Sequence, residues 1–300
     1  MNLITSSIGQ GLLWAILGIA LFLTFRILNF PDMTVEGTFP LGAAIAVTAI
    51  VNGVSPLVAT ILSFLGGAAG GLITGLLYTK GKIPILLAGI LVMTACLSVN
   101  LRIMGGSNVS LLGKKTFFSA KIFQTLPRYF DGVVIGGIAV IVIALLIALF
   151  LQTDLGQAFI VTGDNEIMAR SLGIHTDKMT ILGLMLSNGL VGLDGALIAQ
   201  SNGYADANMG IGIIVIALAS IIIGEVVFGY LTLNERLVAV ILGSIIYRFV
   251  LLIVLQLGFS TNDLNLISAI ILALCLMLPT LRHALKLDRI VHKGLSNHEK

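Results

Sequence analysis

The residues of this chain best suited to a specific interaction lie in a polar segment, 162–174, between two long apolar stretches. Asp164 and Asn165 can accept hydrogen bonds from the free amides that begin a helix, and Glu166 would lie at the positive end of the helix dipole. Gly173 can adopt the left-handed backbone that ends a helix. The pattern predicts a short, capped helix that serves as a handle for a soluble partner.

This predicted helix would carry an apolar ridge beside Glu166 and Arg170. The residues that share one face, or lie next to it at the i, i+4 spacing, are Ile167, Met168, Ser171, Leu172 and Ile174. Such a ridge fits contact with another protein, although a loop resting on lipid headgroups could show a similar pattern. A capped start combined with a glycine stop favours the protein contact.

A second set of candidate residues is polar and lies within or beside apolar stretches. Its members are Asn29, Asp32, Thr34, Glu36, Asn188 and Asp194. A charged side chain at the centre of a bilayer costs about 2.5–3.5 kcal/mol, so Asp194 is expected to face the interior of a helix bundle. Glu225 and Arg248 also lie in apolar stretches, where a structural ion pair or an interface-facing side chain explains them at least as well as a substrate contact.

No motif for a chemical reaction accompanies these residues. The nearest approach to a phosphate-binding loop, at 108–116, lacks its first glycine and has lysine in place of the final Ser or Thr. HExxH, CxxC and GxSxG motifs are absent from the sequence, which argues against an intramembrane hydrolase. The apolar stretches hold no chain of protonatable residues, which argues against a proton-coupled transporter. Transport with energy supplied by a partner is the remaining interpretation.

The composition places the chain in a membrane. Hydrophobic residues make up 57% of the sequence and charged residues only 10%, whereas soluble proteins contain about 25% charged residues. The net charge of +3 gives no indication of a nucleic-acid partner. Cys96 and Cys275 both lie in apolar runs and are predicted to be reduced packing residues, with no disulfide or metal site.

The predicted fold is all-α: residues 1–300 form a single polytopic membrane helix bundle with about nine apolar segments. These segments are 8–25, 38–51, 56–79, 83–104, 131–151, 179–200, 209–228, 233–257 and 263–280. The second segment is too short for a simple span, and Pro31 and Pro40 would both break a helix there, so it is predicted to be a broken or re-entrant helix. The glycines at 66–75 predict close approach between helices.

The distribution of Lys and Arg predicts the orientation. With the amino terminus outside and the carboxyl terminus inside, eleven of the 17 basic residues fall on the cytoplasmic side. Residues 105–130 are then an external linker and residues 281–300 a cytoplasmic tail. A basic external loop of this length fits a docking protein, with anionic lipid headgroups as the alternative.

Three segments carry a resemblance to a known family. The segment GDNEIMARSLGI, at 163–174, resembles the cytoplasmic coupling loop of permease subunits of bacterial ABC importers, in the branch that includes the ribose and branched-chain amino-acid permeases. Residues 32–37 look like the D-L-S-V-G turn that breaks an early helix in these permeases, with Glu36 inserted before the glycine. Residues 217–229 are similar to the late helix that precedes an inner turn.

The resemblance implies a multi-pass permease of the bacterial cell membrane that works as a pair. Two ATP-binding subunits would bind the ATP and magnesium, so that this chain needs no cofactor and is not an enzyme. An extracytoplasmic substrate-binding lipoprotein would deliver the ligand to a path at the interface between the two permease copies. The residues expected to couple to the ATPase are Asp164, Asn165, Glu166, Ile167, Ala169, Arg170, Leu172 and Gly173, and the polar set named above supplies candidates for the path or gate.

The resemblance is nearest to the amino-acid branch, the tryptophan- or tyrosine-like permeases. It implies a small polar solute, with an amino acid, including aromatic ones, favoured. Nucleosides and sugars remain alternatives, because ligand choice in such importers usually resides in the binding protein. A secondary transporter or a non-transporting membrane scaffold is the alternative from a different class.

Overall fold

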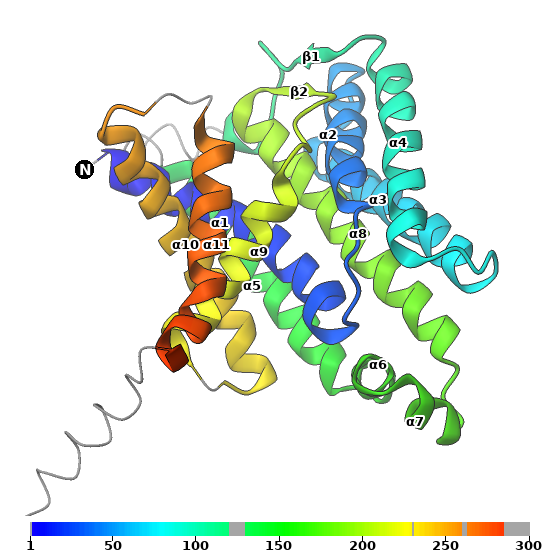
Figure 1. Ribbon diagram of the computed structural model, residues 1–300. Helices are drawn as coiled ribbons and strands as arrows, with labels where there is room; N and C mark the ends of the chain where they lie inside the picture. Colours follow the sequence, from blue (N-terminus) through cyan, green and yellow to red (C-terminus); the bar gives the residue numbers. More distant parts are fainter. Residues whose placement is uncertain (1, 120–129, 230, 260–262, 285–300) are drawn as a thin grey trace, which may run out of the picture.

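The computed structural model describes residues 2–119, 130–229, 231–259 and 263–284. The elements along the chain are α1 (Asn2–Leu21), the π-helix η1 (Phe22–Ile27), α2 (Val35–Val51), α3 (Pro56–Thr79), α4 (Ile85–Met104), β1 (Asn108–Ser110), the 3-10 helix η2 (Phe117–Ser119), α5 (Phe130–Gln152), α6 (Asp154–Asp164), α7 (Glu166–Ser171), α8 (Thr176–Asn202), β2 (Tyr204–Asp206), α9 (Ile213–Phe228), α10 (Leu233–Gln256) and α11 (Leu264–Ala284) (Figure 1). Residues 120–129 of the expected linker and 285–300 of the expected tail lie outside the described residues.

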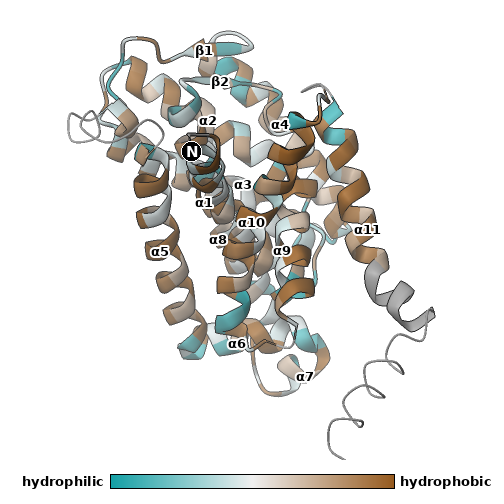
Figure 2. Ribbon diagram, turned by 90° about the vertical axis from the view of Figure 1, so that its left-hand side faces the viewer, coloured by the Kyte–Doolittle hydropathy of each residue, from teal (hydrophilic) through white to brown (hydrophobic). Residues whose placement is uncertain are grey.

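Each of the nine predicted apolar segments contains a helix, which confirms the all-α membrane fold. Within the described residues, six helices are long and apolar enough to cross a membrane: Leu3–Ile27, Pro56–Thr79, Ile85–Met104, Phe130–Gln152, Thr176–Asn202 and Leu233–Gln256. The apolar parts of the other three are shorter, at Val35–Val51, Ile213–Phe228 and Leu264–Met277. Figure 2 shows brown, apolar residues along the outside of α5 and α11, with polar residues gathered toward the two ends of the bundle.

The chain is interrupted before the second segment, but the segment itself, 38–51, lies in one continuous helix, α2, and only one of the two prolines lies at the interruption. The chain leaves the helical conformation after Ile27 and becomes helical again at Val35, so Pro31 lies in the break. Pro40 lies inside α2, and the expectation that it also breaks the helix is wrong. Because α2 begins shortly before Pro40, the missing N–H frees only one carbonyl, that of Glu36, near the start of the helix.

Glycines bring α3 and α8 into backbone contact, which confirms the close approach predicted from the glycines at 66–75. A Cβ added at Gly67 would collide with the carbonyl oxygen of Asn188, and one at Gly71 with that of Leu184. Small residues permit this separation in helices that pack within a membrane. The contact places the polar side chain of Asn188 next to the broken helix, at the centre of the group formed by α2, α3 and α8.

The bundle has two distinct ends. At one end β1 pairs antiparallel with β2, with Asn108 opposite Asp206; at the other lie α6 and α7 (Figure 1). Gly9, near the start of α1, lies against Gly132, near the start of α5. The amino terminus and the described part of 105–130 therefore lie away from α6 and α7, the arrangement expected from the basic residues. Which end faces the cytoplasm stays a prediction.

Candidate coupling surface and translocation path

The predicted coupling helix, 163–174, comprises the last two residues of α6 and all of α7, and Asn165 between them has an extended backbone with a φ of −155° and a ψ of 99°. Asn165 lies between α6 and α7 and is the N-cap of α7, where its Oδ1 accepts a hydrogen bond from Met168 N at 3.0 Å. Asp164 is the last residue of α6, so the capping role expected of both residues belongs to Asn165 alone. Gly173 has a φ of +81°, the left-handed backbone expected at the end of this helix.

The surface of α7 carries exposed apolar side chains. Ile167 is 81% exposed, Met168 54% and Leu172 64%, whereas Ala169 is fully buried. Adjacent exposed apolar side chains in an otherwise polar loop are typical of surfaces that contact another protein or a membrane. We call Ile167, Met168 and Leu172 the α7 surface.

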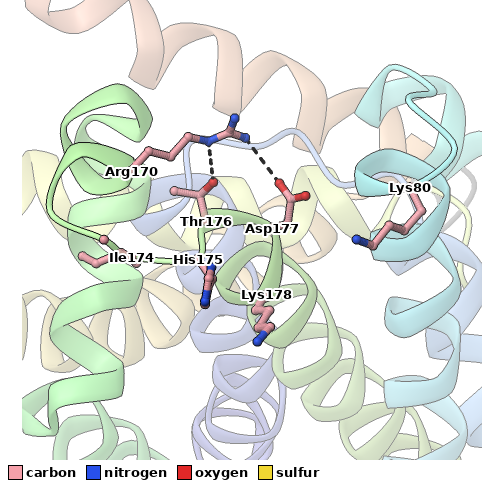
Figure 3. Close-up of a pocket in the computed structure, with 8 residues that line it drawn as sticks. Lys80, Arg170, Ile174, His175, Thr176, Asp177 and Lys178 are labelled. Atoms are coloured by element: carbon pink, nitrogen blue, oxygen red, sulfur yellow. Dashed lines mark hydrogen bonds and ion pairs between the residues drawn. The ribbon is translucent and has the colours of Figure 1, made fainter.

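Hydrogen bonds from Arg170 join α7 to the start of α8. Its Nε donates to Thr176 Oγ1 at 2.9 Å, and its Nη2 donates to Glu166 Oε1 at 2.6 Å and to Asp177 Oδ1 at 3.3 Å. Figure 3 shows the bonds to Thr176 and Asp177 beside a cavity of about 430 Å³, which Lys80 also lines. Arg170 therefore joins α7 to the start of α8, a contact that the sequence pattern did not predict, whereas its pairing with Glu166 has the i, i+4 spacing of a helix.

The coupling segment contacts the break between η1 and α2 directly. Asn29 Nδ2 donates a hydrogen bond to the carbonyl oxygen of Gly163, in α6, at 3.2 Å. Gly163 packs so closely that an added Cβ would collide with the carbonyl oxygen of Ile27. Asn29 has a φ of +57°, a left-handed conformation that asparagine tolerates better than most residues. A displacement of α7 would thus reach the broken helix through α6.

Three of the six candidate path residues meet in one buried network. Asp32 Oδ2 accepts a hydrogen bond from Asn188 Nδ2 at 2.7 Å, and Asp32 Oδ1 accepts one from Thr34 N at 2.9 Å. Asn188 Oδ1 accepts from Thr38 Oγ1 at 2.8 Å, and the hydroxyls of Thr34 and Thr74 are 2.8 Å apart. All five residues are buried. The network ties the break and α2 to α3 and α8.

Asp194 faces the interior of the bundle, as predicted, but lies apart from this network. It is fully buried, and neither carboxylate oxygen has a hydrogen-bond partner among the described residues.

The guanidinium group of Arg248 lies over the ring of Trp14, 4.5 Å from its centroid, a cation–π contact. Glu225 forms an ion pair with Arg26, in agreement with a structural ion pair for this residue.

Glu36, the last of the six candidates, lies in the first turn of α2 and bonds to the residue that precedes α9. Its Oε1 accepts a hydrogen bond from Gly212 N at 3.1 Å, immediately before α9 begins at Ile213. Gly37 packs against Met93 in the middle of α4, so α2 begins well inside the bundle. Helices that begin inside a membrane are found where they line protein or water, because their free backbone groups need partners.

The polar site near Glu36 includes a residue that sequence reasoning missed. Asn100, in α4, lines the same cavity as Glu36. An asparagine inside the apolar segment 83–104 was the available signal, since a buried amide without a partner is costly. The span expected over 209–228 also begins too early. Residues 209–212 belong to the turn before α9, and the helix itself begins at Ile213.

Comparison with known proteins defines the class of this fold and site. Residues 3–278 match the model of the family described as branched-chain amino acid transport system / permease component. The chain is 42% identical, over 286 residues, to the tyrosine transport system permease protein of Clostridioides difficile (strain R20291), with 95% of this chain and 94% of that protein covered. The chain belongs to this permease family and is a multi-pass membrane permease of an ABC importer.

Two solved structures share the fold. One is a chain of PsaBC from Streptococcus pneumoniae in complex with Fab, with a TM-score of 0.50, 17% sequence identity, and 91% of this chain and 89% of that chain covered. The other comes from a metal-chelate type ABC transporter in an inward-facing conformation, with a TM-score of 0.50, 16% identity, and 94% and 85% of the two chains covered. At these identities the likeness concerns the fold alone.

Proposed function

We propose that this permease imports an α-amino acid, with aromatic amino acids such as tyrosine favoured, as one of two identical copies. ATP-binding subunits dock on the α7 surface and supply the ATP and magnesium chemistry. A substrate-binding lipoprotein delivers the amino acid at the β1–β2 end. The α7 end then faces the cytoplasm of a bacterial cell, and lipid surrounds the remaining apolar surface.

The similarity to a tyrosine transport permease across 95% of the chain carries the choice of substrate. The α7 surface supports the docking of an ATP-binding subunit. Its apolar side chains are exposed, and the hydrogen bonds of Arg170 join it to α8. Rigidity matters here because a coupling contact must transmit displacement, and the bonds of Arg170 and Asn29 join α7 and α6 to the helices behind them.

Two peripheral helices support the pairing of two copies. The main contacts of α4 in the described part of the chain are with α2 and α3, and those of α11 are with α9. Figure 1 shows α4 and α11 at opposite sides of the break and of the start of α9. Both helices carry exposed leucines, such as Leu91 on α4 and Leu274 on α11. A second copy on this face would cover these leucines and enclose the start of α9.

Reconstitution tests this function directly. The permease is purified with its cognate ATP-binding subunit and lipoprotein, inserted into proteoliposomes, and supplied with labelled tyrosine, tryptophan, leucine, ribose or adenosine. We expect ATP-dependent accumulation of tyrosine or tryptophan, and none when the P-loop lysine of the ATP-binding subunit is replaced. Accumulation of ribose or adenosine in place of amino acids would overturn the substrate assignment. Uptake driven by a proton gradient without the ATP-binding subunit would instead indicate a secondary transporter.

A further inference from the structure

A cavity of about 210 Å³ lies where α2, α4 and the turn before α9 meet. The polar residues among those that line it are Glu36, Thr94, Asn100 and Asn208, and Met93 and Ile211 are among its apolar residues. The three contributing segments are far apart in the sequence. The cavity lies between the start of α2 and the turn that leads into α9, the two helices that begin inside the bundle.

Asn100 is the first indication that this cavity holds a ligand. Its side chain is fully buried, and neither its Nδ2 nor its Oδ1 has a hydrogen-bond partner among the described residues. The large majority of buried side-chain amides in proteins are paired, so an amide with an unused donor and an unused acceptor at the wall of a cavity requires an explanation, which a polar molecule in that cavity would supply.

The second indication is the carboxylate of Glu36. The amide of Gly212 holds its Oε1, which leaves Oε2 without a hydrogen bond in the described part of the chain. None of the described residues that line the cavity is a lysine, arginine or histidine. The cavity thus contains a fixed, half-buried acidic group with no cationic side chain to neutralise it, an arrangement that attracts a cation.

We propose that this cavity binds a zwitterionic α-amino acid on its way through the permease. Glu36 Oε2 accepts a hydrogen bond from the ammonium group, Asn100 Nδ2 donates to the carboxylate, and Asn100 Oδ1 accepts a further ammonium proton. The side chain of the amino acid packs against Met93 and Ile211, where a methionine sulfur and an aromatic ring make favourable contacts. This inference rests on the proposed function and adds the groups that recognise the substrate.

The same chemistry excludes other classes of solute. A sugar lacks the cation that would pair with Glu36, and a carboxylic acid without an ammonium group would be repelled by it. Binding through a few groups also suits a transport path, since the affinity of such importers resides mainly in the binding protein.

A cysteine placed in the cavity provides a test that needs no transport. The background variant carries Cys96→Ala and Cys275→Ala, and Thr94→Cys adds one thiol that lines the cavity. The purified permease–ATPase complex is treated with a cationic or an anionic methanethiosulfonate reagent. Relative to the control Leu112→Cys, which is 93% exposed and lies outside the cavity and the membrane-spanning helices, we expect a preference for the cationic reagent on the order of tenfold. Glu36→Gln should abolish this preference.

Protection experiments identify the ligand class. L-tyrosine should slow the reaction of Thr94→Cys, and 3-(4-hydroxyphenyl)propionate, which lacks the ammonium group, should not. Asn100→Leu should abolish protection but keep the charge preference, because Glu36 is intact. Equal protection by both compounds, or none by either, in a complex that imports tyrosine would overturn this inference alone. Failure of the unmodified complex to import any amino acid would overturn the proposed function instead.

Discussion

Arg26, in η1, donates hydrogen bonds to both carboxylate oxygens of Glu225, near the end of α9. The bond from Nε to Oε1 is 2.8 Å long, and the two residues are 199 positions apart in the sequence. Because η1 leads into the break before α2, and α9 begins at the cavity beside Glu36, the ion pair joins the two segments on the α7 side of that cavity. If a substrate leaves the cavity on this side, as the proposed function requires, the ion pair would restrain the two elements that have to separate.

Reversing the charges of this pair tests its role. We expect Arg26→Glu and Glu225→Arg each to slow uptake several-fold in proteoliposomes, and the double variant to recover most of the rate. The side chain of Arg26 is 40% exposed and that of Glu225 only 17%, so each single variant, which places two like charges together, should also lower the thermal midpoint, and the double variant should restore it. Normal uptake by both single variants would show that the pair does not control transport.

The α7 surface can be tested by its affinity for the ATP-binding subunit. Ile167→Ser and Leu172→Ser should each weaken co-purification of that subunit by roughly tenfold or more, since burying such a side chain contributes about 1.5–3 kcal/mol. Leu112→Ser is the matched control, because Leu112 is 93% exposed and follows β1 at the other end of the bundle. Equal retention of the ATP-binding subunit by all three variants would place the docking surface elsewhere.

The contact between Asn29 and Gly163 predicts a separation of ATP hydrolysis from transport. Asn29→Gly keeps the left-handed backbone but removes the hydrogen bond, so the complex should assemble and hydrolyse ATP while importing less substrate for each ATP. Asn29→Ala should show the same defect and also lower the thermal midpoint, because a left-handed backbone costs a residue with a Cβ about 1–2 kcal/mol. An unchanged ratio of import to hydrolysis in Asn29→Gly would exclude this contact from coupling.

Features that depend on neighbouring residues could be predicted from the sequence. The nine apolar segments follow from composition and length, and the break follows from Pro31, which precedes the short second segment. The N-cap at Asn165 and the stop at Gly173 are local backbone requirements of a helix. Pro40 misled the prediction because a proline near the start of a helix removes only one bond of that helix.

The assembly of the candidate site could not be predicted in the same way. Asp32 and Asn188 are 156 positions apart, and nothing in one sequence indicates that their side chains meet. The start of α9 escaped because residues 209–214 read as a continuous apolar run, although Gly210 and Gly212 lie in a turn there. Such pairings depend on how helices pack, which a pattern along the chain does not encode.

The orientation of the bundle gives a further prediction. In the background without cysteines, Ser119→Cys should react with an impermeant thiol reagent added to intact cells, and Ser171→Cys only after permeabilisation. Both serines are exposed, and they lie at opposite ends of the bundle in η2 and α7. The reverse pattern of labelling would invert the assignment of the α7 surface to the cytoplasm.

Asn100 allows the binding role of the cavity to be distinguished from a structural one by stability. A buried amide without partners costs about 1–3 kcal/mol, so Asn100→Leu, which replaces it with an apolar group of similar size, should raise the thermal midpoint by a few degrees while uptake falls. Asn188→Leu is the matched control, because Asn188 is equally buried but bonded to Asp32 and Thr38, and it should lower the midpoint. Differential scanning fluorimetry of the two purified variants measures both shifts. A fall in the midpoint of both variants would mean that Asn100 supports the fold. A rise for Asn100→Leu together with lost uptake would mean that Asn100 lowers the stability of the protein but is needed for substrate binding.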